Sequence, residues 1–244
     1  MTLIPHYSEL IKALPDGPLT RQDLLIADLL VAKEKQLEIY YAPYDYVNQD
    51  AKIIIAGITP GFTQMALSLQ QARMDLIAGI PSGEIDRRAK IIATFAGPMR
   101  INLIQMLDEL RLNELLNIPT TKLLFDDLRS LIHTTSVIRY PTFNNGRNYS
   151  GHSPQILSSS LLKDYVIRGF ANELKQIGEA VIIPLGKSVS DVLRWLQTEG
   201  LDLQDRCLLD FPHPSGANGH RHKQFDSLKE RHRALLWNAR EQFK

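Results

Sequence analysis

The chain has 244 residues, of which 44% are hydrophobic and 23% charged. This balance is typical of folded globular proteins and excludes disordered and fibrous classes. The 28 Lys and Arg residues nearly balance the 27 Asp and Glu residues, so the net charge of +1 gives no overall electrostatic reason to expect a polyanionic partner.

The cysteine content and the opening residues indicate in which cellular compartment the chain is expected. Cys207 is the only cysteine, which excludes an intramolecular disulfide, a cysteine-rich zinc site and a four-cysteine cluster. The opening residues lack the basic and apolar regions of a signal peptide, and no run approaches the ~20 apolar residues of a membrane span. We therefore expect a cytoplasmic monomer without a membrane partner, folded as a single domain over residues 1–244.

The N-terminal 40 residues are expected to be helical and to pack on this domain. Thr20 is a suitable N-cap, and apolar residues follow it at helical spacing, which predicts a helix over Arg21–Tyr40.

Beyond this segment, short apolar runs that end in loop-forming residues predict four strands. They are Lys52–Ile58, Leu131–Arg139, Ala180–Leu185 and Arg206–Phe211. Apolar residues at three- and four-residue spacing predict amphipathic helices. They are Phe62–Ala78, Asn102–Leu112, Leu161–Lys175, Ser188–Leu196 and Lys223–Arg240. Since strands alternate with helices, we predict an α/β fold with a parallel sheet and helices on both faces.

Ligands of such sheets bind beyond the carboxyl ends of the strands, where three loops are expected to meet. They are Gly57–Phe62, Tyr140–Pro154 and Phe211–His222. The first loop is rich in Gly and Pro, so its backbone amides could approach a phosphate, a base or a developing negative charge. A simple strand-to-helix turn is the alternative.

The last loop holds His213 between two prolines, which restrict its backbone and suit a side chain presented at fixed geometry. A solvated loop histidine is the alternative. From Phe211 to the end, seven Lys and Arg residues stand against three acids, a balance that suits contact with phosphates or a merely solvated helix. Four histidines cluster here, but no carboxylate pattern or cysteine ligands accompany them, so we expect no metal and no cofactor.

Five segments resemble motifs of the uracil-DNA glycosylase superfamily. IIIAGITPGFTQ (53–64) is similar to its strand followed by Gly-x-x-Pro-Gly, and PHPSGANGHR (212–221) to its His-Pro-Ser motif. FAGPMRINLIQML (95–107), TTSVIRYP (134–141) and VIIPLGKSV (181–189) resemble segments that lie between these two motifs in bacterial members. The resemblance covers residues 40–225 and implies a three-layer α/β/α sandwich around a mainly parallel four-stranded sheet.

The resemblance also implies that the chain excises a damaged or modified base flipped out of single- or double-stranded DNA. His213 would face the negative charge on the departing base, and Thr59 would orient the attacking water. The implied base-contacting residues are Gly57, Ile58, Pro60, Gly61, Phe62, Phe95, Ser136 and Asn145. The implied DNA-contacting residues are Ser215, Gly216, Ala217, Asn218, His220, Arg221 and Lys223.

Two positions depart from the family pattern. Thr59 stands where related motifs carry Asn, Asp or Glu, and a hydroxyl cannot act as a base near neutral pH. Ser136 stands where the family often has an Asn that reads the base edge, so the substrate base need not be uracil. Two alternatives follow: a non-catalytic nucleic-acid-binding protein of the same fold, or a hydrolase of nucleosides or nucleotides.

Overall fold

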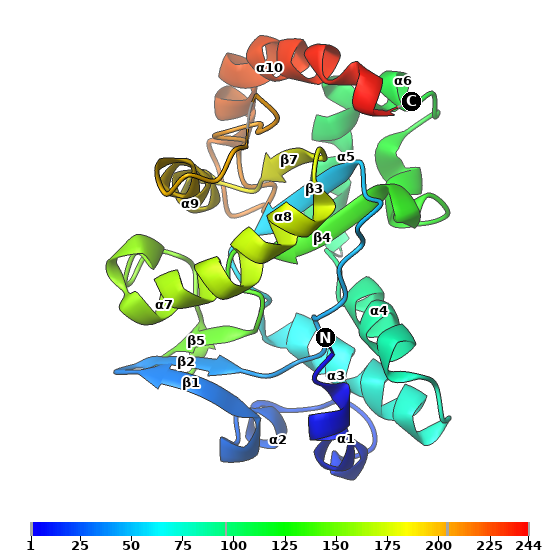
Figure 1. The fold of residues 1–244 in the computed structure, drawn as a ribbon, viewed down its shortest axis with the longest axis vertical. Coiled ribbons are helices and arrows are strands. Elements are labelled where there is room, and N and C mark those ends of the chain that lie inside the picture. Colours follow the sequence, from blue (N-terminus) through cyan, green and yellow to red (C-terminus); the bar gives the residue numbers. More distant parts are fainter. Residues whose placement is uncertain (1, 96, 204, 244) are drawn as a thin grey trace. The chain divides into compact units, whose positions relative to one another are not determined.

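The computed structural model describes residues 2–95, 97–203 and 205–243 (Figure 1). Ala96, in the segment resembling Gly-x-Pro, and Lys244, counted in the basic end, lie outside the described residues. The chain forms two compact units. Unit 1 comprises Met1–Tyr46, Thr59–Thr94 and Ile138–Gly169, and unit 2 comprises Val47–Ile58, Phe95–Val137 and Phe170–Lys244. Each unit is thus assembled from three separate stretches of chain.

Unit 2 is built on a parallel sheet. Its strands are β3 (Ile53–Gly57), β4 (Ile132–Ser136) and β7 (Val181–Pro184), in the order β4-β3-β7. Every residue of β3 and β7 is buried, as expected for apolar runs covered on both faces. Three of the four predicted strands, and the α/β class, are therefore confirmed.

The fourth strand, predicted over Arg206–Phe211, does not form as a strand. This segment joins the sheet through one parallel bridge between Ile182 and Cys207. Ile182 N donates to Arg206 O at 2.8 Å, and Leu208 N donates to Ile182 O at 2.9 Å. The extended conformation then ends, because Asp210 has a φ of +65° and Pro212 has no N–H to donate.

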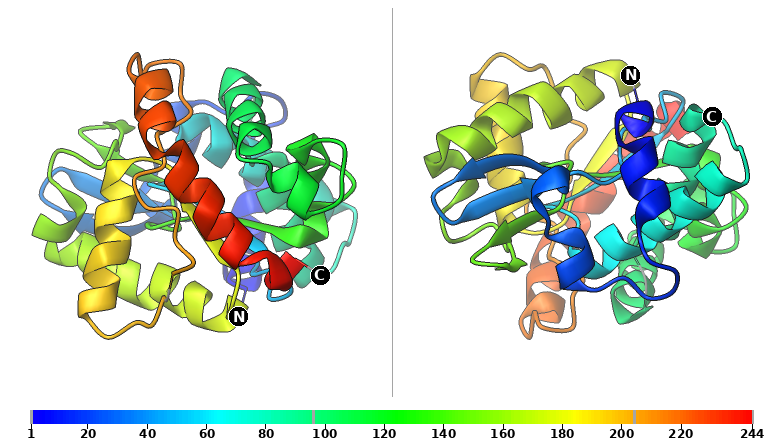
Figure 2. Two further views of the ribbon diagram at one scale, coloured as in Figure 1. Left: turned by 90° about the horizontal axis from the view of Figure 1, so that it is seen from above. Right: turned by 90° about the horizontal axis from the view of Figure 1, so that it is seen from below.

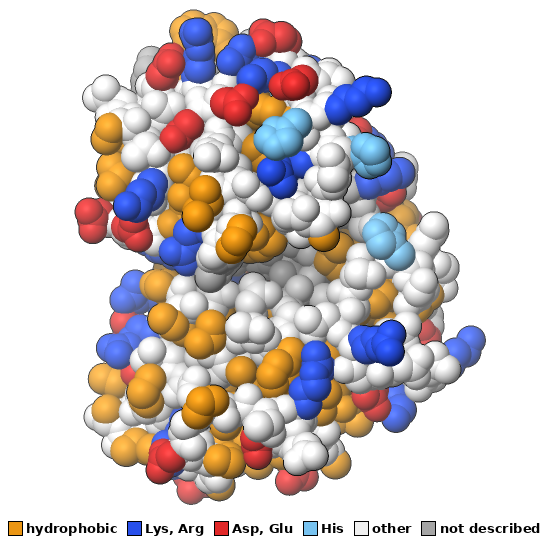
Figure 3. Space-filling model, turned by 180° about the vertical axis from the view of Figure 1, so that it is seen from behind, with side chains coloured by type: hydrophobic (Ala, Val, Ile, Leu, Met, Phe, Trp, Pro, Cys, Tyr) orange, Lys and Arg blue, Asp and Glu red, His pale blue; other side chains and the backbone are white. Residues whose placement is uncertain are grey.

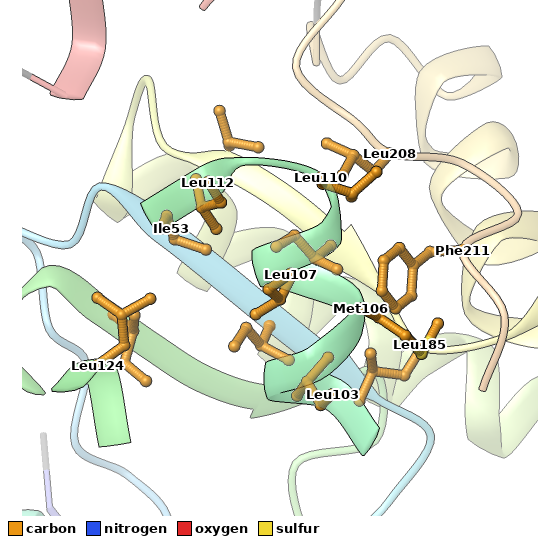
Figure 4. Close-up of a cluster of buried hydrophobic side chains, with 14 of the residues drawn as sticks. Ile53, Leu103, Met106, Leu107, Leu110, Leu112, Leu124, Leu185, Leu208 and Phe211 are labelled. Atoms are coloured by element: carbon orange, nitrogen blue, oxygen red, sulfur yellow. The ribbon is translucent and has the colours of Figure 1, made fainter. Parts of the chain in front are cut away.

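Helices cover both faces of this sheet. α5 (Gly97–Glu109) packs on the face that carries Ile53 and Ile55, and its apolar side chains point toward β3 and toward Phe211 (Figure 4). His133 of β4 lies on the opposite face, paired in register with Ile54, and its Nε2 is 3.1 Å from a carboxylate oxygen of Glu173 in α8 (Asn172–Ile177). The remaining helices of unit 2 include α9 (Lys187–Thr198) and α10 (Arg221–Asn238).

Unit 1 contains an antiparallel sheet of order β1-β2-β5-β6. Figure 2 shows the hairpin of β1 (Leu30–Glu34) and β2 (Leu37–Tyr40) in blue. The helix predicted over Arg21–Tyr40 is therefore wrong beyond its first turn, α2 (Arg21–Leu24). A turn at Lys35, with φ +56°, reverses the chain, and β2 pairs with β5 (Thr142–Asn144). These tertiary hydrogen bonds override the local helical spacing.

The N-terminal segment is accordingly part helix and part sheet, since α1 spans Ile4–Ala13. Helix α3 (Phe62–Ile77) confirms the prediction over 62–78, whereas α4 (Ser82–Ile92) was not predicted. The remaining elements are β6 (Arg147–Asn148), α6 (Leu112–Leu115), α7 (Ser160–Tyr165), the π-helix Val166–Ala171 and short 3-10 helices at Ala27–Leu29, Thr121–Phe125, Arg129–Leu131, Ile156–Ser158 and Arg240–Phe243. None of the described helices has the length and apolar character that crossing a membrane requires.

Candidate functional site

The carboxyl ends of β3 and β4 bring three predicted site residues together. Gly57 and Ser136 end these strands and are paired in register. A Cβ added at Gly57 would lie 3.6 Å from Ser136 Oγ and 4.0 Å from Cε1 of the Phe95 ring. These are ordinary contact distances, so the Ser136 hydroxyl and the Phe95 ring lie beside the backbone of Gly57. Ile58 follows, half-buried.

His213 lies near the end of β7, the third strand of the same sheet. Phe211, two residues earlier, is fully buried in the core beside Met106 and Leu185 (Figure 4). Its carbonyl accepts a hydrogen bond from Gly186 N at 2.9 Å. A Cβ added at Gly186 would lie 3.4 Å from His213 Cβ, so the histidine packs directly against the turn that follows β7.

The imidazole of His213 has a defined protonation pattern. Its Nδ1 accepts a hydrogen bond from Ser215 N at 3.2 Å, so the ring proton of the neutral form is on Nε2. Burial lowers the pKa of His213, which favours this neutral form near pH 7. Within the described part of the chain, no group accepts a hydrogen bond from Nε2. His213 thus holds an uncommitted N–H donor on a half-buried ring.

The loop after His213 is fixed at its base and exposed at its tip. Asn102 of α5 donates to Pro214 O at 2.8 Å, and Asn218 donates to His213 O at 3.3 Å. The Ser215 hydroxyl accepts from Ala217 N at 3.2 Å, and Arg221 donates to Ser215 O at 3.1 Å. The exposed residues of the tip are Gly216, Ala217, Gly219 and His220.

The first turn of α10 carries unbalanced positive charge. Arg221, His222 and Lys223 occupy it with no acidic residue, although the N-terminus of a helix disfavours cations. Within residues 2–95, 97–203 and 205–243, no carboxylate forms an ion pair with Arg221 or Lys223.

Farther along α10, basic side chains are paired with acids. The pairs are Lys229–Glu109, Arg233–Glu230 and, just after the helix, Arg240–Glu241. Figure 3 likewise shows Lys and Arg side chains interspersed with Asp and Glu over the face in view. Three basic side chains of the C-terminal end are therefore paired with acids, whereas the start of α10 beside the His213 loop shows no such pair among the described residues.

Four predicted residues, Thr59 to Phe62, belong to unit 1, where they contact the second predicted loop. Thr59 Oγ1 donates to Tyr140 O at 2.8 Å and accepts from Thr142 N at 3.1 Å. The hydroxyl proton of Thr59 is thus already used within the protein, which leaves one acceptor position for a water. Pro60 beside it is buried.

Gly61 and Phe62 are held by the β5–β6 hairpin. Phe62 N donates to Asn148 Oδ1 at 3.1 Å, and a Cβ at Gly61 would lie 3.2 Å from the amide nitrogen of Asn148. The guanidinium of Arg21 lies over the Phe62 ring, 4.7 Å from its centroid. One face of this ring is therefore covered by Arg21.

Asn145 has a conformational role that the sequence analysis missed. It forms the tip of the β5–β6 hairpin with Gly146, at φ values of +50° and +66°, the signature of a type I′ turn. Its exposed side chain donates to Gln36 Oε1 at 2.9 Å. The Asn145-Gly146 dipeptide was the signal for this hairpin.

Unit 1 also contains a pocket of about 610 Å³. Its lining residues are Glu34, Lys35, Gln36, Leu37, Asn144, His152, Ser153, Pro154, Ser158 and Ser159, none of which is a predicted catalytic or DNA-contacting residue. Among the described residues, no group of three or more His, Cys, Asp or Glu side chains is arranged to hold a metal ion. The residues that surround His213 therefore carry the functional argument.

The chain is similar to a protein of Bacillus subtilis. It is 42% identical over 229 residues to the uncharacterized protein YoxB of Bacillus subtilis strain 168. The matched region covers 93% of this chain and 89% of that protein. No protein-family model matches the chain.

Proposed function

The chain belongs to the family of the uncharacterized protein YoxB, and for it we propose the activity of a DNA glycosylase, which hydrolyses the bond between a base and its deoxyribose. The observation that carries the proposal is the neutral His213, whose Nε2–H is uncommitted at the end of the parallel sheet. The motifs that resemble the uracil-DNA glycosylase superfamily support it. The proposed fold is the three-layer sandwich of the uracil-DNA glycosylase superfamily, with residues 206–211 in place of its fourth strand.

His213 acts on the departing base. Cleavage of the N-glycosidic bond leaves oxocarbenium character on the sugar and negative charge on the base. A preorganised N–H donor stabilises that charge, and removal of a comparable donor in other enzymes costs roughly 3 to 4 kcal/mol. Because Nδ1 is occupied by Ser215 N, the imidazole donates from Nε2 without first changing its protonation state.

Gly57, Phe95 and Ser136 form the proposed contact surface for the base. The Ser136 hydroxyl donates or accepts one hydrogen bond at a base edge, and the absence of a side chain at Gly57 leaves room beside it. The Phe95 ring contributes apolar contact, and Arg100 holds its backbone by donating to Phe95 O. One hydroxyl forms fewer specific hydrogen bonds with a base edge than an amide does. The proposed substrate is therefore a modified base other than uracil.

The loop from Ser215 to His220 and the start of α10 form the proposed DNA contact. Arg221 and Lys223 are cations at the positive end of a helix, an arrangement that a bound phosphate would stabilise. The exposed tip of the loop is suited to enter the duplex as the base leaves its stack, a step that costs a few kcal/mol.

A second candidate function is nucleic-acid binding without cleavage, favoured by the hydrogen bonds of Thr59. Its hydroxyl accepts a hydrogen bond from a water but cannot remove a proton from it near neutral pH. The glycosylase proposal therefore has no base at Thr59, and its turnover is slow.

The test is strand scission after alkali. Labelled single- and double-stranded oligonucleotides carry uracil, hypoxanthine, xanthine, oxidised pyrimidines or bulky modified cytosines. We expect cleavage of at least one substrate other than uracil by the wild type and by His6→Ala, a variant of an exposed histidine in α1, and its loss in His213→Ala. Cleavage that survives in His213→Ala would contradict the proposal, and retained DNA binding without any cleavage would favour the second function.

The DNA contact is tested separately by charge reversal. Lys223→Glu should weaken DNA binding and reduce the salt dependence by about one phosphate contact. Lys175→Glu, which reverses an exposed lysine of α8, is the control and should have a smaller effect. Equal effects of the two variants would argue against a contact at α10.

A further inference from the structure

The three residues before the Pro212–His213 pair are held by several elements of unit 2. We call Leu209, Asp210 and Phe211 the anchor segment. It follows the single bridge to β7 at Cys207, so no regular strand fixes its course. Each of its residues instead has a hydrogen bond to a neighbouring element.

Asp210 has the least ordinary backbone in the segment. Its φ of +65° lies in the left-handed region, which non-glycine residues seldom adopt. Two side chains of α9 secure it there. Asp210 N donates to Ser190 Oγ at 2.8 Å, and its carboxylate forms an ion pair with Arg194.

Ser190 connects the anchor segment to the turn after β7. Its fully buried hydroxyl accepts from Asp210 N and donates to Gly186 O at 3.2 Å. Gly186 in turn donates to Phe211 O at 2.9 Å and packs against His213. One hydroxyl thus links the two backbone segments that meet at His213.

His232 of α10 holds the anchor segment from another element. Its Nε2 donates to Leu209 O at 2.9 Å, and its ring stacks on Phe211 at 6.0 Å between centroids. His232 is 1% exposed, and its Nδ1 is buried without a hydrogen-bond partner among the described residues. His232 is one of the four clustered histidines of the C-terminal region, and its contacts support the backbone of the anchor segment.

None of these three side chains has a hydrogen bond to the His213 ring, yet together they fix the backbone that carries it. Active sites tolerate little misplacement, since a shift of about 1 Å can lower a rate roughly 100-fold. Rare backbone conformations persist only where the surrounding contacts determine them. The contacts of Ser190, Asp210 and His232 therefore determine how the His213 ring is oriented.

We propose that Ser190, Asp210 and His232 are positioning residues that set the direction in which His213 presents its Nε2–H. The effect of these residues on catalysis rests on the proposed function. Their effect on the orientation of the His213 ring does not depend on it. The proposal assigns a role in the site to three residues that lie outside all five segments resembling family motifs.

The test uses the full chain with Ser190→Ala, which removes the linking hydroxyl. Ser68→Ala is the matched control, because Ser68 is also a fully buried helical serine and its hydroxyl donates to Met65 O at 2.9 Å in unit 1. Nitrogen-15 NMR of the His213 imidazole reports its tautomer and its pKa without any substrate. We expect these signals to move in Ser190→Ala, to stay in Ser68→Ala, and to be restored in Ser190→Thr, which keeps a hydroxyl.

Where a cleaved substrate is available, kcat should fall about 10- to 100-fold in Ser190→Ala, while the Kd for DNA changes less than about twofold. Asp210→Asn is the second variant if Ser190→Ala does not fold. Asn tolerates the left-handed backbone but loses the charge that pairs with Arg194, so the His213 signals should again move.

Unchanged His213 signals in a folded Ser190→Ala or Asp210→Asn variant would overturn the proposal. Movement of equal size in Ser68→Ala would overturn it as well. If the wild type cleaves no substrate, the proposed function fails, whereas the NMR comparison still decides the positioning role.

Discussion

Gly186 offers the sharpest test of how backbone geometry supports the His213 site. Its φ of +96° and ψ of 169° form a conformation open almost only to glycine. An alanine there should cost roughly 1 to 3 kcal/mol in backbone strain. The added Cβ would lie 3.4 Å from His213 Cβ, 3.7 Å from Cδ2 and 3.9 Å from Cγ, which are ordinary contact distances. Strain therefore dominates the loss of stability, and relief of that strain displaces His213.

Gly200→Ala is the control that separates these two effects. Gly200 has a similar φ of +89°, but nothing lies within 4 Å of a Cβ added there. Urea unfolding should show a loss of roughly 1 to 3 kcal/mol in each variant. Only Gly186→Ala should shift the His213 NMR signals and lower base excision. The reasoning is refuted if Gly186→Ala unfolds like the wild type, or if Gly200→Ala disturbs His213 to the same extent.

Two further predictions concern buried groups. Burial, reinforced by Asp45, raises the pKa of Asp86 in α4 from 3.8 to about 6. The folded state thus favours the protonated carboxyl of Asp86. As the pH rises from about 4 to about 6 this preference is lost, and the free energy of unfolding falls by about 2 to 3 kcal/mol. Asp86→Asn should therefore gain stability over the wild type across that range in urea titrations, and a constant difference would contradict this. Burial also raises the pKa of Cys207 to about 12, so a thiol reagent should modify it only after unfolding, and rapid modification of the folded chain would contradict this.

The parallel sheet and several helices of the two units were predictable because their signals are local. β3 and β7 are short apolar runs that end in Gly or Pro, and α3 and α9 show clear helical spacing. The hairpin of β1 and β2 was not predicted, because its apolar residues also fit a helix and only pairing with β5 decides between the two. The strand predicted at Arg206–Phe211 failed for a similar reason, since the backbone of Asp210 depends on contacts with α9.

In the candidate site, too, local features could be predicted and long-range contacts could not. His213 and Gly57 could be chosen from sequence because they belong to motifs with recognisable composition. The engagement of Thr59 with Tyr140, and the link that Ser190 makes between two backbone segments, could not be predicted. Both depend on distances between elements far apart in the chain.

The division of the chain into stretches has a consequence for synthesis on the ribosome. The last stretch of unit 1 ends at Gly169, whereas unit 2 requires everything from Phe170 onward, including β7. A nascent chain can therefore complete unit 1 while the sheet of β3 and β4 still lacks its third strand, β7. Because β3 pairs with β7 across more than a hundred residues, this late, long-range closure should be a slow step of folding. His213 reaches its place only after that step, so the proposed chemistry should be among the last properties that the new chain acquires.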